Sequence, residues 1–92
     1  MALRRAHVLV EGRVQGVFFR SSMKEVADRY GVRGWVRNLL GGEVEALVEG
    51  EDAAVHALIE WCWQGPPTAA VDNVAVEWEL PKGEFESFSI RR

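Results

Sequence analysis

The stretch AHVLVEGRVQGVFFRSSMKEVADRYG (residues 6–31) changes its hydrophobic period once, and this change indicates how the chain folds. Residues 6–11 alternate between two faces, with Ala, Val and Val on one of them, which is typical of a half-buried strand. Ser22 and Glu25 have the spacing of a capping box at a helix start, although Arg20 just upstream suggests an earlier start. Gly31 is a stop signal. A single helical stripe is formed by Phe19, Met23, Val26, Ala27 and Tyr30.

The middle of the chain predicts a hairpin and a second helix. VRGWVRN (32–38) and EVEALVE (43–49) have strand patterns and are separated by the turn LLGG. EDAAVHALIEWCWQG (51–65) has an acidic start and an apolar stripe, and its last residue, Gly65, is followed by Pro66 and Pro67 as stop signals. These signals predict strand, strand and helix in that order.

The C-terminal part predicts two strands. VDNVAVEWEL (71–80) carries Val74, Val76, Trp78 and Leu80 on one face. FESFSI (85–90) supplies a last short strand after a turn at residues 81–84. The complete order favours an α+β domain with an antiparallel sheet and both helices on one face. The first and second strands of such a unit run parallel, so loop 12–19, Arg20 and Asn38 should converge at one edge of the sheet.

Length and composition limit the class of protein. With 92 residues, 48% hydrophobic and 27% charged, residues 1–92 predict one compact domain. A net charge of -3 argues against a nucleic-acid surface, so any bound anion should be small. Cys62 is the only cysteine, which excludes an internal disulfide and indicates a reducing, cytoplasmic compartment. The apolar run before Glu11 is too short for a secretion signal or a membrane span.

The loop EGRVQGVFFR (11–20) has the composition of an anion site. Gly12 and Gly16 allow positive φ or close approach, so that successive N–H groups can turn toward a ligand. The following helix directs its unpaired N–H groups to the same place, and Arg20 adds a planar donor pair for two phosphate oxygens. The same residues also fit a tight loop with a solvated arginine, and Asn38 before LLGG also fits a turn former. From the residues alone, both interpretations stay open.

EGRVQGVFFR, YGVRGWVRNLLGGEVEALVEG and the closing FSIRR together resemble the acylphosphatase family, whose members hydrolyse the mixed anhydride of a carboxylic acid and phosphoric acid. The resemblance covers almost the whole chain. It implies a ferredoxin-like βαββαβ sandwich with a short extra C-terminal strand, and a monomeric enzyme without metal or cofactor. It also implies that Arg20 and Asn38 are catalytic. The backbone N–H groups that hold phosphate would come from Arg13, Val14, Gln15, Gly16, Val17, Phe18 and Phe19.

Two kinds of catalytic group are missing from the sequence, and their absence limits the possible mechanisms. A cysteine-type phosphatase would need Cys six residues before Arg20, where Val14 stands. His7 and His56 lie on different predicted elements and form no ligand cluster with carboxylates. Hydrolysis of an acyl phosphate requires neither a cysteine nucleophile nor a metal ion, because the conjugate acid of its leaving carboxylate has a pKa of about 4. We therefore expect Arg20 and the loop amides to hold the phosphoryl group while Asn38 orients a water for in-line attack, with inorganic phosphate as a product.

Two other functions share part of these features. RNA-recognition domains have the same order of strands and helices, and RVQGVFFR faintly resembles their aromatic strand motif. Here, however, the aromatic residues fall in the loop and the helix start. A non-catalytic phosphate-binding or substrate-channelling module is the second alternative, because an acylphosphatase-like domain also occurs inside larger carbamoyl-transfer proteins. The end of the chain soon after the last predicted strand favours a free-standing enzyme.

Overall fold

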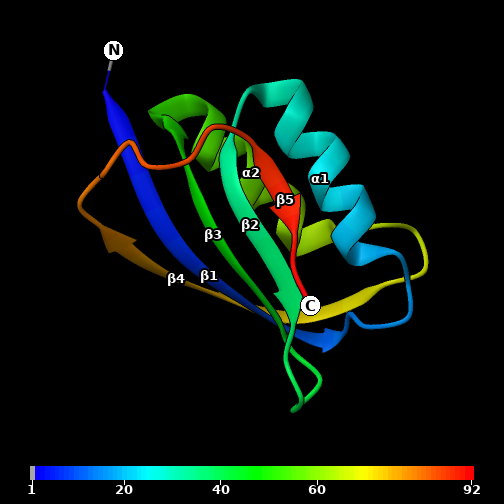
Figure 1. Cartoon of the computed structure of the whole chain (residues 1–92). Helices are drawn as coiled ribbons and strands as arrows, with labels where there is room; N and C mark the ends of the chain where they lie inside the picture. The colour runs from blue at the N-terminus through cyan, green and yellow to red at the C-terminus, as the bar shows by residue number, and fades with distance from the viewer. Residues whose placement is uncertain (1) are drawn as a thin grey trace.

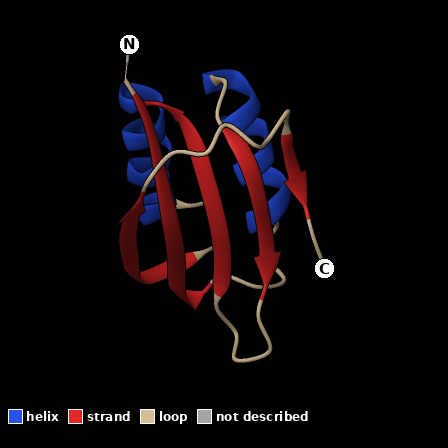
Figure 2. Ribbon diagram, turned by 60° about the vertical axis from the view of Figure 1, so that its left-hand side comes forward, coloured by secondary structure: helices blue, strands red, loops and turns tan. Residues whose placement is uncertain are grey.

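The chain folds into a five-stranded sheet covered on one face by two helices, in a computed structural model that describes residues 2–92 (Figures 1 and 2). Met1, which the predicted domain includes, lies outside the described residues. The order confirms the predicted α+β ferredoxin-like architecture. The elements are β1 (Leu3–Arg13), α1 (Phe19–Tyr30), β2 (Arg33–Asn38), β3 (Val44–Glu51), α2 (Asp52–Gln64), β4 (Ala70–Glu79) and β5 (Phe88–Ile90).

The sheet order, β4-β1-β3-β2-β5, places the ends of two important strands side by side. β1 and β2 are both antiparallel to β3, so they run parallel to each other. Val44 of β3 pairs with Val10 on one side and with Asn38 on the other. The C-terminal ends of β1 and β2 therefore lie at one edge. β5 is parallel to β2, so the sheet is mixed rather than wholly antiparallel as predicted.

The core lies between the sheet and the helices. The alternating residues of β1 that face the helices are completely buried, and each helix buries one stripe against them. Three residues predicted to share buried faces are exposed. Tyr30 is three positions beyond the last buried residue of α1, Trp78 is on the edge strand β4, and Leu80 lies beyond that strand. Within residues 2–92, no helix is long and apolar enough to span a membrane.

The connection from β4 to β5 corrects the prediction of a simple turn at residues 81–84. β4 and β5 lie at opposite edges of the sheet, so residues 80–87 cross the face that the helices leave open (Figure 2). The Arg5 side chain under this segment is 4% exposed and pairs with Glu49, Glu79 and Glu84. The Glu49 carboxylate also accepts hydrogen bonds from the backbone N–H groups of Lys82 and Gly83. This network fixes the crossing segment, and with it the position of β5.

Substitution of Gly34, in the middle of β2, is predicted to cause a large loss of stability. Its φ is 136°, and a Cβ there would lie 1.8 Å from the carbonyl oxygen of Leu47. We expect Gly34→Ala to lower the free energy of unfolding by more than about 3 kcal/mol, because a backbone clash adds to conformational strain of roughly 1–3 kcal/mol.

Chemical denaturation measures this difference, with Gly42→Ala as the matched control. Gly42 has a φ of 103°, but a Cβ there would meet nothing within 4 Å. The control should therefore lose only the strain contribution. Equal losses in the two variants would show that the close approach of β2 and β3 at Gly34 has no effect on stability.

Candidate active site

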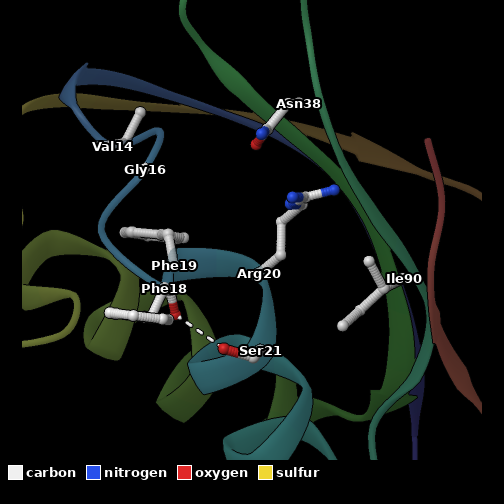
Figure 3. A pocket seen from close by; sticks show the side chains of 8 residues that line it. All are labelled: Val14, Gly16, Phe18, Phe19, Arg20, Ser21, Asn38 and Ile90. Carbon is white, nitrogen blue, oxygen red and sulfur yellow. Dashed lines mark hydrogen bonds between the residues drawn. The ribbon is translucent and has the colours of Figure 1, made fainter.

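A pocket of about 340 Å³ lies at the edge where β1 and β2 end (Figure 3). Its walls come from the loop before α1, the first turn of α1, the end of β2, and β5. The pocket therefore joins segments that are far apart in the sequence. It brings Arg20 and Asn38 together with part of loop 12–19. The lining residues are Val14, Gly16, Phe18, Phe19, Arg20, Ser21, Asn38 and Ile90.

The N-terminus of α1 borders the pocket without a side-chain cap. The predicted capping box is wrong, because the helix begins at Phe19 and Ser22 lies inside its first turn, where its N–H donates to the carbonyl oxygen of Phe18 at 3.0 Å. The earlier start is set by packing, since the buried Phe19 ring lies 5.2 Å from the ring of Trp61. The first N–H groups of a helix have no partner inside it. The positive end of α1 is therefore available to an anion.

The loop before α1 has the alternating backbone of an anion-binding concavity. Gly16 has a φ of 73° and Phe18 a φ of 65°, while Val17 between them has no such positive value. Alternation of this kind turns successive N–H groups toward one side. Val17 is buried in the core, and its carbonyl oxygen accepts a hydrogen bond from the Thr68 hydroxyl at 3.0 Å. Val17 thus anchors the loop to the core, while Gly16 remains exposed.

Arg20 presents an unpaired guanidinium to this pocket. It is partly buried in the first turn of α1, and its side chain extends between the loop and β5 (Figure 3). The ion pairs formed within residues 2–92 do not include it. Their cationic members are Arg4, Arg5, His7, Lys24, Arg37 and His56. The N–H groups of the Arg20 guanidinium are therefore free to donate hydrogen bonds to oxygens of a ligand.

Asn38 contributes a buried acceptor that has no partner. It is the last residue of β2, and its side chain points into the pocket on the side of Arg20 (Figure 3). Its Oδ1 is one of three buried side-chain polar atoms without a hydrogen bond in the described chain. The other two, on Arg5 and Asp52, each face an opposite charge at 3.4–3.5 Å. No protein group within residues 2–92 satisfies this acceptor, so it is available to a small molecule in the pocket.

Three residues predicted to bind substrate do not line the pocket. Arg13 ends β1, is exposed, and pairs with Ala70 of β4. Val17 is buried. The Gln15 side chain donates from Nε2 to the carbonyl oxygens of Leu39 at 2.6 Å and Glu43 at 2.9 Å. Gln15 therefore braces the hairpin loop that follows Asn38, and these two carbonyl oxygens occupy the donor group of its side chain.

Two lining residues were absent from the sequence prediction. Ser21 follows Arg20 directly, and its hydroxyl donates to the Phe18 carbonyl oxygen at 3.2 Å. Its place in the first helical turn indicates this contact only if the helix begins at Phe19. Ile90 belongs to β5 and reaches the pocket only because residues 80–87 cross the sheet. No local pattern in the sequence carries that information.

The remaining reactive side chains lie outside the pocket. Within residues 2–92 there is no group of three or more His, Cys, Asp or Glu side chains arranged to hold a metal ion. His7 contacts Glu45 through Nε2 at 2.6 Å on the open face of the sheet. Burial opposes ionisation of Glu45, but hydrogen bonds from His7 and Arg37 outweigh it and lower the pKa of this carboxyl. Burial raises the pKa of the Cys62 thiol to about 12, so this sulfur stays protonated.

The fold and the pocket define a ferredoxin-like α+β protein with a free guanidinium and a free carboxamide at one edge of its sheet. The family model for acylphosphatase matches residues 6–90. The acylphosphatase of Pyrobaculum islandicum is 60% identical over 87 residues, which cover 94% of this chain and 92% of that protein.

Two solved structures of acylphosphatases are also similar to this chain. An acylphosphatase from Coxiella burnetii superposes with a TM-score of 0.92 at 43% identity, covering 97% of this chain and 93% of that one. The acylphosphatase from Bacillus subtilis gives 0.93 at 34% identity, covering 99% and 100%. The chain therefore belongs to the acylphosphatase family. The predicted enzyme class is confirmed in preference to the RNA-binding and non-catalytic alternatives.

Proposed function

We propose that this enzyme hydrolyses the carboxyl–phosphate bond of acyl phosphates by direct attack of a water that Asn38 orients. The observation that supports this most strongly is the buried, unpartnered Oδ1 of Asn38 in the same pocket as the unpaired guanidinium of Arg20. An amide oxygen can accept one hydrogen of a water, which leaves a lone pair of that water free to attack phosphorus. The hydrogen bond that no protein group makes to Oδ1 is then made by a reactant.

Binding of the phosphoryl group is assigned to Arg20 and to backbone N–H groups of the loop and of α1. The planar guanidinium can donate to two phosphoryl oxygens, and the uncapped helix N-terminus and the alternating loop can donate to the same group. Donors held rigidly in place stabilise the charge that spreads over the phosphoryl oxygens in the transition state. In this proposal, Arg13, Gln15 and Val17 act through their backbone and through support of the loop.

The chemical step needs little further assistance. The bond between phosphorus and the acyl oxygen breaks as the bond from water to phosphorus forms, and the electron pair leaves with the carboxylate. The conjugate acid of this leaving group has a pKa of about 4, so no general acid is required. A proton of the attacking water passes to a phosphoryl oxygen. The products are a carboxylate and inorganic phosphate.

We further propose that the enzyme acts as a monomer in the cytoplasm. We assign it a monomeric state, because Arg20 and Asn38 line the same pocket and the proposed reaction needs no residue from a second copy. Cys62 is a free, buried thiol, which supports a cytoplasmic location. We also assign no nucleic acid or membrane partner to it.

Phosphate release from benzoyl phosphate tests the proposed function. We expect turnover at an undiminished rate in the presence of excess EDTA, because the pocket residues alone bind and position the reactants. The measurement compares initial rates with and without the chelator, and after addition of Mg²⁺ or Zn²⁺. Loss of activity in EDTA with recovery in one cation would contradict a reaction carried by Arg20 and Asn38 alone.

Gln15 is predicted to influence turnover by positioning Asn38. Its two hydrogen bonds hold residues 39 and 43, at the two ends of the loop after Asn38. Each bond contributes about 1 kcal/mol, so Gln15→Ala should lower kcat roughly 10-fold, while KM for benzoyl phosphate changes less. Steady-state kinetics separate the two constants. Gln64→Ala, at the exposed end of α2, is the control and should match the wild type.

A change in KM with constant kcat would show instead that Gln15 acts on phosphate binding. Gln15→Glu adds a second comparison, because its carboxylate would face two carbonyl oxygens and cannot donate to them. We expect this variant to be impaired at least as much as Gln15→Ala. An unchanged kcat in both variants would remove the positioning role.

A further inference from the structure

Two apolar side chains at the mouth of the pocket are not accounted for by folding. Four of the eight lining residues are apolar beyond glycine. Val14 and Phe19 are 1% and 2% exposed, so the core explains their presence. Phe18 and Ile90 are 76% and 42% exposed and contribute much less to the core. Unlike the other exposed apolar side chains of the described residues, these two line the pocket beside Arg20 and Asn38 and are available to contact a ligand there.

The backbone conformation of Phe18 is also unusual for this residue type. Among residues 2–92, Phe18 is the only residue other than glycine with a positive φ, at 65°. This left-handed conformation is unfavourable for a bulky side chain, and glycine or asparagine would adopt it more readily. Neither the burial of Phe18 nor its backbone conformation therefore favours phenylalanine at this position. Unusual conformations that folding does not require are concentrated at ligand sites.

Ile90 is held rigidly on the opposite side of Arg20. It pairs with Val36 of β2, and the N–H of the following Arg91 donates to the Val36 carbonyl oxygen at 2.8 Å. Phe88, two residues earlier on the same face of β5, is 2% exposed and packs in the core. Ile90 thus continues the apolar face of β5 beyond the core, and its side chain extends toward Arg20 (Figure 3).

We propose that Phe18 and Ile90 form an acyl-binding subsite and that the enzyme prefers acyl phosphates with an apolar acyl group over those with a second carboxylate. This inference rests on the proposed function, in which Arg20 binds the phosphoryl group. With the phosphoryl group there, the acyl group extends toward the mouth of the pocket. Arg20 is the single cationic side chain among the lining residues of the described chain. A second carboxylate would therefore lie near apolar side chains, with no further cation in the pocket.

A series of substrates with matched leaving groups tests the subsite. Acetyl and hexanoyl phosphate release carboxylates of nearly equal basicity, so a difference in kcat/KM reports on the acyl chain. We expect hexanoyl phosphate to exceed acetyl phosphate by about 10-fold or more, in line with the gain from added methylene groups in an apolar site. Succinyl monophosphate, which carries a second carboxylate, should fall below hexanoyl phosphate by at least about the same factor.

The variants Ile90→Ala and Phe18→Ala assign the preference to residues. Alanine at position 18 retains an unfavourable left-handed backbone, so this change removes mainly the ring. Each variant should lower the hexanoyl-to-acetyl ratio of kcat/KM by roughly 5-fold. Leu40→Ala is the control, because Leu40 is fully exposed in the neighbouring hairpin loop and does not line the pocket. Its ratio should equal that of the wild type.

Competitive binding of hexylphosphonate and methylphosphonate provides a readout that does not depend on turnover. The wild type should bind hexylphosphonate more tightly, and both variants should lose this difference. Failure of the wild type to hydrolyse any acyl phosphate would overturn the proposed function. Hydrolysis of all three substrates with equal kcat/KM, or ratios unchanged in both variants, would overturn the acyl subsite while leaving the proposed function in place.

Discussion

Replacing Arg20 by alanine is expected to lower kcat/KM for benzoyl phosphate by about 10³–10⁴-fold, with an increase in KM and a decrease in kcat. Arg20 is the single cation lining the pocket within the described chain, and no ion pair occupies its guanidinium there. Removing it leaves only neutral N–H donors for a doubly charged group. Both the ground state and the more delocalised transition state should lose stabilisation.

Arg20→Lys separates charge from geometry. Lysine retains the positive charge but cannot donate two parallel hydrogen bonds from a planar group, so we expect it to recover only a minor part of the lost activity. Arg29→Ala is the matched control, because Arg29 is an exposed residue in the last turn of the same helix. Steady-state kinetics and binding of inorganic phosphate measure these effects. Recovery of near wild-type activity in Arg20→Lys would show that charge alone is sufficient.

Asn38→Ala is expected to lower kcat by about 10²–10³-fold while KM changes by only a few fold, which is the range for removing one positioned group at a reacting centre. The Oδ1 atom of Asn38 has no hydrogen-bond partner in the protein, so its loss breaks no internal contact of that atom. The effect should therefore appear in turnover rather than in stability. Denaturation curves and steady-state kinetics on the same preparations test both expectations.

Two comparisons sharpen this prediction. Asn38→Asp preserves the shape and an acceptor oxygen, but it places a negative charge beside the phosphoryl group, so we expect weaker substrate binding in addition to slower turnover. Asn73→Ala is the control, since Asn73 is exposed on β4 and, within the described residues, its side chain hydrogen-bonds only to Glu11, at 3.3 Å. Full activity in Asn38→Ala would remove the water-orienting role from the mechanism.

Periodicity and glycine signals were sufficient to predict the order of strands and helices. Two periods, one of alternation and one of three to four residues, show which face of each segment is buried, and they do so within a window of a few residues. The parallel arrangement of β1 and β2 follows from that order, and with it the proximity of Arg20 and Asn38. The catalytic roles predicted for these two residues rest on the resemblance of three motifs to the acylphosphatase family.

Other features depended on contacts between distant parts of the chain. The start of α1 at Phe19 depends on packing against Trp61 of α2, which outweighs the local capping signal at Ser22. The bracing role of the Gln15 side chain depends on two carbonyl oxygens of the hairpin, more than 20 residues away. Local propensity contains no information about such partners.

Signals only a few residues long are enough to predict the α+β order, Arg20 near a helix start and Asn38 at a strand end. Contacts in the folded chain are needed to show that residues 80–87 cross the sheet, that β5 joins β2 in parallel, and that Ile90 reaches the pocket. This difference arises because a strand pairs with whichever sheet edge is open to it. That choice depends on the assembled sheet and on the Arg5 network beneath the crossing segment.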